Sequence, residues 1–316
     1  MSKDRILDSL GRIDDEVIQK VNQARTTQKP KPQVRRWAVL AACFALMISM
    51  ALTAEATNGT VSNLLAPLFG GAQTKIVDEI GVPIGASTSV NGYTLTVDAI
   101  IGDRYSVMIA YTLTRDDGQP IPENIDFQGK GMWASGYHTK ILIDENDPSI
   151  AHFHERNHRN TQILGRVVTT SFENLVIHNG DEEDTIVAEG TWEITFTIRY
   201  PDTTEKLPVK SFDVTDKGGN RYKVKKIMLS PMGIHLDLVF YSPHSEGGIF
   251  KDFTMSLIMA DGTEQLLEDG GGGGHWTEGD KKADIDYYAE FDIPIPREDI
   301  KAIVICGTTY ELNNSN

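Results

Sequence analysis

Residues 93–114 read YTLTVDAIIGDRYSVMIAYTLT, and this stretch decides the fold class. Tyr93, Leu95 and Val97 alternate with polar residues, which is the period-two pattern of a strand buried on one face. The pair Asn91-Gly92 stands just before it and is a strong hairpin signal. A Gly-Asp pair in the middle divides the stretch into two strands. The stretch therefore predicts antiparallel β structure.

Similar strand patterns continue to the C-terminus, with a polar break around Pro201 to Pro208. The pattern predicts two Ig-like β-sandwich domains, at residues 76–204 and 205–316, each of a size typical of that class. Residues 55–75 form a juxtamembrane segment, which we expect to pack on the neighbouring domain or to lie on the outer membrane face. No long helical pattern follows Phe69, which argues against an α/β enzyme fold.

Residues Trp37 to Ala54 read WAVLAACFALMISMALTA. As a helix these residues span about 27 Å, close to the roughly 30 Å of a bilayer's hydrocarbon core. Residues 20–36 before the run contain Lys and Arg but no acidic residue. By the positive-inside rule, we expect a single-pass protein of the cell membrane with a cytoplasmic N-terminus and an extracytoplasmic C-terminus.

The alternative to an uncleaved transmembrane helix is a signal peptide, because Ala54-Glu55-Ala56 has the small-x-small form of a cleavage site. A signal peptide has a short, unstructured leader and an apolar region of about 7–15 residues. Here residues 1–36 precede the apolar run and include an organised amphipathic segment. The sequence therefore favours the anchor.

Charge follows the same division. Residues 1–36 hold nine Lys/Arg and five Asp/Glu, a net charge of +4. Because the whole chain has a net charge of −15, the remaining residues carry −19. An acidic exported part argues against direct nucleic-acid binding, which calls for a basic surface. Cys43 lies inside the expected span and Cys306 near the C-terminus, so they cannot pair within one chain. The exported part is thus expected to depend on its hydrophobic core alone.

The cytoplasmic tail, residues 1–36, contains one amphipathic segment. Its apolar residues recur at helical spacing, and two short helices fit the pattern as well as one. Such a segment has nothing of its own to cover its apolar face, so it either lies on the inner membrane surface or docks in a protein groove. The acidic run Asp14-Asp15-Glu16 would be repelled by anionic lipid, which favours a protein partner. The candidate partner-binding residues are Ile6, Leu7, Leu10, Ile13, Val17, Ile18 and Val21.

The sequence contains few patterns typical of catalysis or metal binding. His152, His154 and His158 form the densest ligand-like cluster, but they lack a cysteine or a second HxxxH. The acidic runs at residues 144–147 and 181–184 lack the alternating spacing of a calcium loop and indicate solvated turns. Gly270 to Gly274 lacks the Lys-Ser/Thr of a phosphate loop, so we expect a hairpin end. With no GxSxG present, we expect no catalytic, cofactor or metal site and no enzyme activity.

Two segments of the chain together resemble a known family. They are ILDSLGRIDDEVIQKV before the expected span and IVDEIGVPIGASTSVNGYTLTVDAIIGDRYSVMIAYTL after it. They are similar to the membrane-anchored, anti-sigma-factor-like proteins of low-GC Gram-positive bacteria, in which a domain of unknown function precedes an Ig-like domain. The resemblance implies a cytoplasmic tail that holds a sigma factor and an exported part that senses envelope conditions. The alternative is a surface-anchored Ig-like binding or scaffold protein with an incidental tail.

Overall fold

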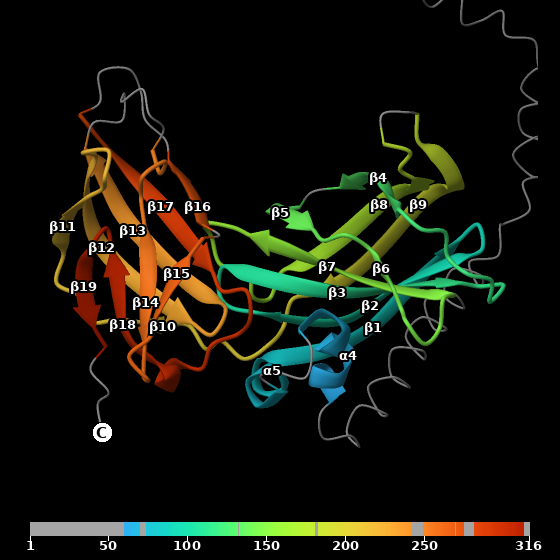
Figure 1. Ribbon diagram of the computed structural model, residues 1–316, viewed down its shortest axis with the longest axis horizontal. Coiled ribbons are helices and arrows are strands. Elements are labelled where there is room, and N and C mark those ends of the chain that lie inside the picture. The colour runs from blue at the N-terminus through green and yellow to red at the C-terminus, as the bar shows by residue number, and fades with distance from the viewer. Residues whose placement is uncertain are drawn as a thin grey trace, which may run out of the picture. The chain divides into compact units, whose positions relative to one another are not determined.

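The computed structural model describes residues 60–69, 74–131, 133–180, 183–241, 249–268, 270–274 and 281–312 (Figure 1). The expected tail and the expected span Trp37–Ala54 lie outside these residues. Within the described residues, no helix is both long and apolar enough to cross a membrane. The described chain is mainly β, as the sequence predicts.

The stretch that decides the fold class forms the hairpin of β2 (Tyr93–Gly102) and β3 (Ser106–Arg115). Tyr93, Leu95 and Val97 are all buried, so the alternation correctly identified the inner face of β2. Asn91 and Gly92 both have positive φ, as a tight turn between right-twisted strands requires. This turn joins β1 (Gly81–Val90) to β2 in antiparallel register.

The first half of the described chain contains two antiparallel sheets. One has the order β1-β2-β3-β7-β5, with β6 also pairing β7, and the other has the order β4-β8-β9. The remaining strands are β4 (Ile125–Gly131), β5 (Ser135–His138), β6 (Leu142–Ile143), β7 (Ile150–His158), β8 (Val167–Ile177) and β9 (Thr185–Thr197).

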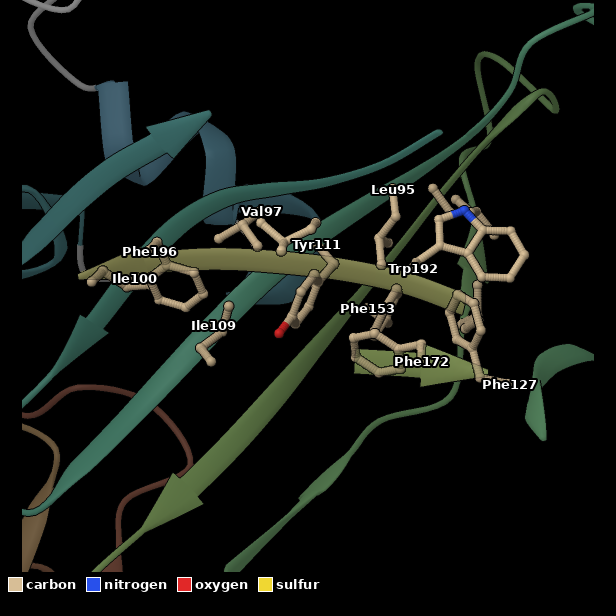
Figure 2. Packing of buried hydrophobic residues seen from close by; sticks show 14 of the residues in the cluster. Leu95, Val97, Ile100, Ile109, Tyr111, Phe127, Phe153, Phe172, Trp192 and Phe196 are labelled. Atoms are coloured by element: carbon tan, nitrogen blue, oxygen red, sulfur yellow. The ribbon is translucent and has the colours of Figure 1, made fainter. Parts of the chain in front are cut away.

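Both sheets of the first half contribute to one aromatic core, shown in Figure 2. Tyr111 stacks on Phe153 with ring centroids 4.8 Å apart, and the ring of Phe172 meets Tyr111 edge-on at 5.3 Å. Trp192 is fully buried, and its indole N–H donates to the carbonyl of Tyr93 at 3.0 Å. A buried tryptophan thus keeps its one polar group paired, as a stable core requires.

The second half repeats the arrangement with its own two sheets, ordered β10-β12-β13-β17-β16, with β11 also pairing β12, and β15-β14-β18-β19. A short 3₁₀ helix, η2 (Arg297–Asp299), precedes β18. The strands are β10 (Glu205–Lys206), β11 (Phe212–Thr215), β12 (Arg221–Ser230), β13 (Gly233–Tyr241), β14 (Met255–Met259), β15 (Glu264–Leu267), β16 (Gly270–Gly274), β17 (Lys282–Glu290), β18 (Ile300–Ile305) and β19 (Thr308–Glu311).

The buried side chains of the two halves form separate cores, one ending at Tyr200 and the next beginning at Leu207. The expected domain boundary at 204/205 lies between these two residues. Nevertheless, the chain from Ala56 to Asn316 forms one compact unit. Independent folding of each half stays a prediction.

Two helices precede the first strand, α4 (Thr60–Phe69) and α5 (Thr74–Ile80). The first sandwich domain is expected to begin at residue 76, but its first strand begins only at Gly81, and α5 occupies the residues before it, with Val77 and Ile80 buried one helical turn apart. They belong to a third apolar cluster with Val61 and Leu65 of α4. α4 therefore packs on the β structure that follows it.

The expectation of a hairpin end at Gly270–Gly274 is also wrong, because these glycines form the edge strand β16, paired with β17. A Cβ on Gly270 would overlap the side chain of Tyr287, and a Cβ on Gly274 would overlap that of Ile285. Glycine is needed there because β16 lies close to these side chains of β17, a use of glycine that no hydrophobic pattern reveals.

Candidate functional site

The seven candidate partner-binding residues of the tail lie outside the described residues, so their docking stays a prediction. The candidate site within the described residues is a polar junction, where side chains of the first half meet side chains of the second. We define this junction by Asp103, Ser106, Arg156 and His158 of the first half, and by Ser230, His235, Asp237, Asp286 and Tyr288 of the second.

The three histidines of the ligand-like cluster, His152, His154 and His158, lie on strand β7, where residues two apart share a face. They do not converge on one point. His152 contacts Thr112 and Asp144, with Nδ1 3.0 Å from the Thr112 hydroxyl and Nε2 3.4 Å from the Asp144 carboxylate. His158 instead stacks on Tyr288 with ring centroids 4.4 Å apart.

The acidic run at residues 144–147 is a turn that satisfies its own polar groups. One carboxylate oxygen of Asp144 accepts hydrogen bonds from the backbone N–H groups of Asn146 and Asp147, at 2.8 and 2.9 Å. These bonds, and the nearby His152, lower the pKa of Asp144. The second acidic run includes residues 181–182, which lie outside the described residues.

A buried network of hydroxyls and one carboxylate joins the two halves. Asp103 Oδ1 accepts from the backbone N–H groups of Tyr105 and Ser106, at 2.8 and 2.7 Å, and its Oδ2 accepts from the Ser230 hydroxyl at 2.6 Å. The hydroxyls of Ser106 and Tyr288 lie 2.6 Å apart. Burial raises the pKa of Tyr288 well above its usual value, so this phenol stays protonated.

Arg156 of β7 makes a second connection. Its guanidinium donates to the backbone carbonyls of Phe291 at 2.9 Å and of Asp292 at 2.7 Å, while the Glu290 carboxylate lies 3.4 Å away. Because Arg156 is only 8% exposed, these partners replace the water that a charged side chain would otherwise need. The first half is thus held to the loop after β17.

A histidine and two aspartates form a compact cluster on β13 and β17. His235 and Asp237 are two residues apart on β13, and Asp286 pairs directly with Asp237 across to β17. His235 Nε2 lies 3.6 Å from Asp237 Oδ1 and 3.5 Å from Asp286 Oδ1. The imidazole is almost fully buried and stacks on Tyr105 of the first half at 4.3 Å.

The two aspartates of this cluster have different electrostatic environments. His235 and then Lys226 stabilise the charged form of Asp237, and its pKa falls to about 2 despite partial burial. Burial raises the pKa of Asp286, although His235 opposes the change. Lys226 contacts Asp237 at Oδ2, the oxygen that does not face His235.

An open groove of about 500 Å³ adjoins the junction and is lined by residues of β5, β7, β16 and β17. Arg156, His158, Tyr288 and Glu290 contribute to its walls. Three of its lining residues, Arg156, His158 and Tyr288, belong to the junction.

Sequence reasoning missed the cluster of His235, Asp237 and Asp286. The HxD spacing on a strand was a usable signal, because it places both side chains on one face. Asp286 could not be added from the sequence, since only the register of β13 on β17 brings it opposite Asp237.

No protein-family model matches this chain, and no curated protein matches it. Among solved structures, it is similar to one described as the crystal structure of the conserved domain protein from Bacillus anthracis. The TM-score is 0.47 and the sequence identity 16%, over 71% of this chain and 76% of that chain. At this level the similarity carries no argument about function.

Proposed function

We propose that this chain is a single-pass membrane regulatory protein, an anti-sigma-factor-like envelope sensor that holds a sigma factor through its cytoplasmic tail. In this proposal the tail is cytoplasmic, residues 37–54 span the membrane, and two Ig-like sandwiches lie outside. The apolar stripe of the tail, the apolar run and the charge division of the sequence support this arrangement.

The observation that carries the proposal is the packing of α4, which begins only a few residues after the expected span. Val61 and Leu65 of α4 are buried in a cluster that contains Ala99 and Met108 of the first half and Met232 of the second. A sensor needs a firm connection between its exported part and its span. Helix α4 supplies such an attachment on the exported side, because its buried side chains belong to a cluster that includes residues of both halves.

The proposal is tested by transcription from sigma-dependent promoters in cells that carry tail variants. Leu10→Asp places a charge on the apolar stripe and should release the sigma factor, which raises transcription. Gln19→Asp adds the same charge on the opposite face of the expected helix and serves as the matched control. Equal transcription from both variants and from the wild type would argue against the regulatory function.

The alternative is a surface-anchored Ig-like binding or scaffold protein. It shares the span and the exported sandwiches, so topology does not separate the two functions. The tail does, because a scaffold has no need of an apolar stripe. A scaffold tolerates Leu10→Asp without any change in transcription while its exported part remains folded and anchored.

A further inference from the structure

We propose that His235, Asp237 and Asp286 bind a divalent transition-metal ion, with zinc as the best fit. The site lies in the part of the chain expected outside the membrane. It rests on the geometry of these three residues and is independent of what the tail binds.

The spacing of the ligand atoms supports the proposal. His235 Nε2 lies 3.5 and 3.6 Å from one oxygen of each aspartate, and all three ligand atoms lie within 4.8 Å of one another. Metal bonds of about 2.1 Å in a tetrahedron place neighbouring ligand atoms about 3.4 Å apart. The two His–Asp distances are therefore near those of two edges of a zinc tetrahedron, and a water molecule would complete the fourth position.

The three ligands stand on a rigid support. His235 and Asp237 are on the central strand β13, and Asp286 is on its hydrogen-bonded neighbour β17. Strands position ligands more accurately than loops do. Tyr105 stacks on the imidazole and fixes the plane of its ring.

Lys226 acts in this proposal as an outer partner of the site. Its ammonium group contacts Asp237 Oδ2, which leaves Oδ1 directed toward His235. Hydrogen bonds to the second oxygen of a ligating carboxylate commonly orient it for a metal. Lys226 also offsets part of the charge of the two aspartates before the ion binds.

The competing explanation is a protonated His235 that forms ion pairs with both aspartates. An imidazolium should donate a hydrogen bond from Nε2, and the 3.5 and 3.6 Å separations are longer than a good N–H···O bond. In the proposed site a neutral imidazole ligates through Nε2, and the two carboxylates balance the charge of the divalent ion.

Zinc suits this ligand set better than calcium or magnesium. Calcium and magnesium prefer sites made of oxygen ligands alone, whereas imidazole nitrogen favours zinc and its neighbours in the first transition series. Zinc accepts one nitrogen and two carboxylate oxygens with water as the fourth ligand. Because Tyr105 of the first half lies on His235 of the second, the ion would also stiffen the junction.

The experiment uses the full chain, purified in detergent without a polyhistidine tag and stripped with a chelator. Titration with zinc chloride should show saturable binding of one ion per chain and a rise in the melting temperature. Asp286→Asn and His235→Gln should each weaken binding at least tenfold. The control Asp284→Asn changes an exposed carboxylate on the same strand, which pairs with Lys225, and should bind as the wild type does.

Cobalt substitution gives a readout that does not depend on the variants. Cobalt bound at this site should show the intense visible absorption bands of a tetrahedral ion, without a sulfur-to-metal charge-transfer band. The proposal is overturned by the absence of saturable zinc binding, by binding that both ligand variants retain, or by cobalt spectra typical of an octahedral ion. If the metal-binding proposal is overturned, the proposed binding of a sigma factor by the tail is unaffected.

Discussion

The Ser230 hydroxyl donates a 2.6 Å hydrogen bond to Asp103 Oδ2, and both residues are buried although 127 positions separate them in the chain. Each half therefore supplies a polar group that the other half satisfies. A buried carboxylate that loses a donor keeps its desolvation cost without the compensating bond. The junction is a structural unit and not a chance contact of two sandwiches.

Substitution Ser230→Ala should lower the free energy of unfolding by about 1–3 kcal/mol, because Asp103 loses a buried donor. Urea unfolding followed by circular dichroism measures this loss. Ser89→Ala is the matched control, since the Ser89 hydroxyl bonds to Thr94 on an exposed surface. Equal losses in the two variants would show that the bond across the junction adds nothing to stability.

Arg156→Met should lower the free energy of unfolding by more, about 2–4 kcal/mol, because two backbone carbonyls of the second half lose their charged donor, that of Phe291 in a buried bond and that of Asp292 in a partly buried one. The methionine preserves much of the packing of the arginine stem. We also expect one unfolding transition in the wild type and two in the variant, measured by calorimetry. Arg166→Met is the control, because its guanidinium lies on the exposed surface. A single transition in both variants would contradict the coupling through Arg156.

Asp98→Asn should stabilise the protein at alkaline pH but not at acidic pH. Burial raises the pKa of Asp98 to about 6, from 3.8, although a hydrogen bond from Thr112 and the nearby His152 oppose the rise. The folded state therefore binds a proton more tightly than the unfolded state, and stability is lost as pH rises from about 4 through 6. Asparagine still accepts the bond from Thr112 but carries no charge.

The expected gain in the free energy of unfolding is about 3 kcal/mol at pH 8 and near zero at pH 4. Urea midpoints measured across this range test the prediction, with Asp213→Asn, an exposed position of β11, as the control. A gain that does not vary with pH would indicate an effect of packing and not of charge.

The sequence predicted the parts of the fold that depend on local patterns. Alternation around Leu95 and the pair Asn91-Gly92 identified a strand and its turn, because both signals act over a few residues. Helix α5 was missed because seven residues are too few for a clear helical period. Strand β16 was missed because glycines carry no hydrophobic pattern.

The candidate site depended on long-range register and was harder to predict. Asp286 lies opposite Asp237, and Ser230 lies beside Asp103, only after distant strands have paired and the halves have met. The histidines of β7 formed a dense cluster in the sequence but point to separate neighbours in the structure. The tail residues remain a prediction from periodicity alone.

The most direct test of the account is recovery of the tail's partner from detergent extracts of cells. Full-length wild type, Leu10→Asp and Gln19→Asp are purified in parallel, and the co-purified cytoplasmic proteins are identified by mass spectrometry. Each large apolar side chain buried in a groove contributes about 1–3 kcal/mol to binding, and a charge in its place adds a desolvation cost. The account predicts a sigma factor with the wild type and with Gln19→Asp, and its loss from Leu10→Asp. Recovery of the same proteins with all three, and no sigma factor among them, would contradict it.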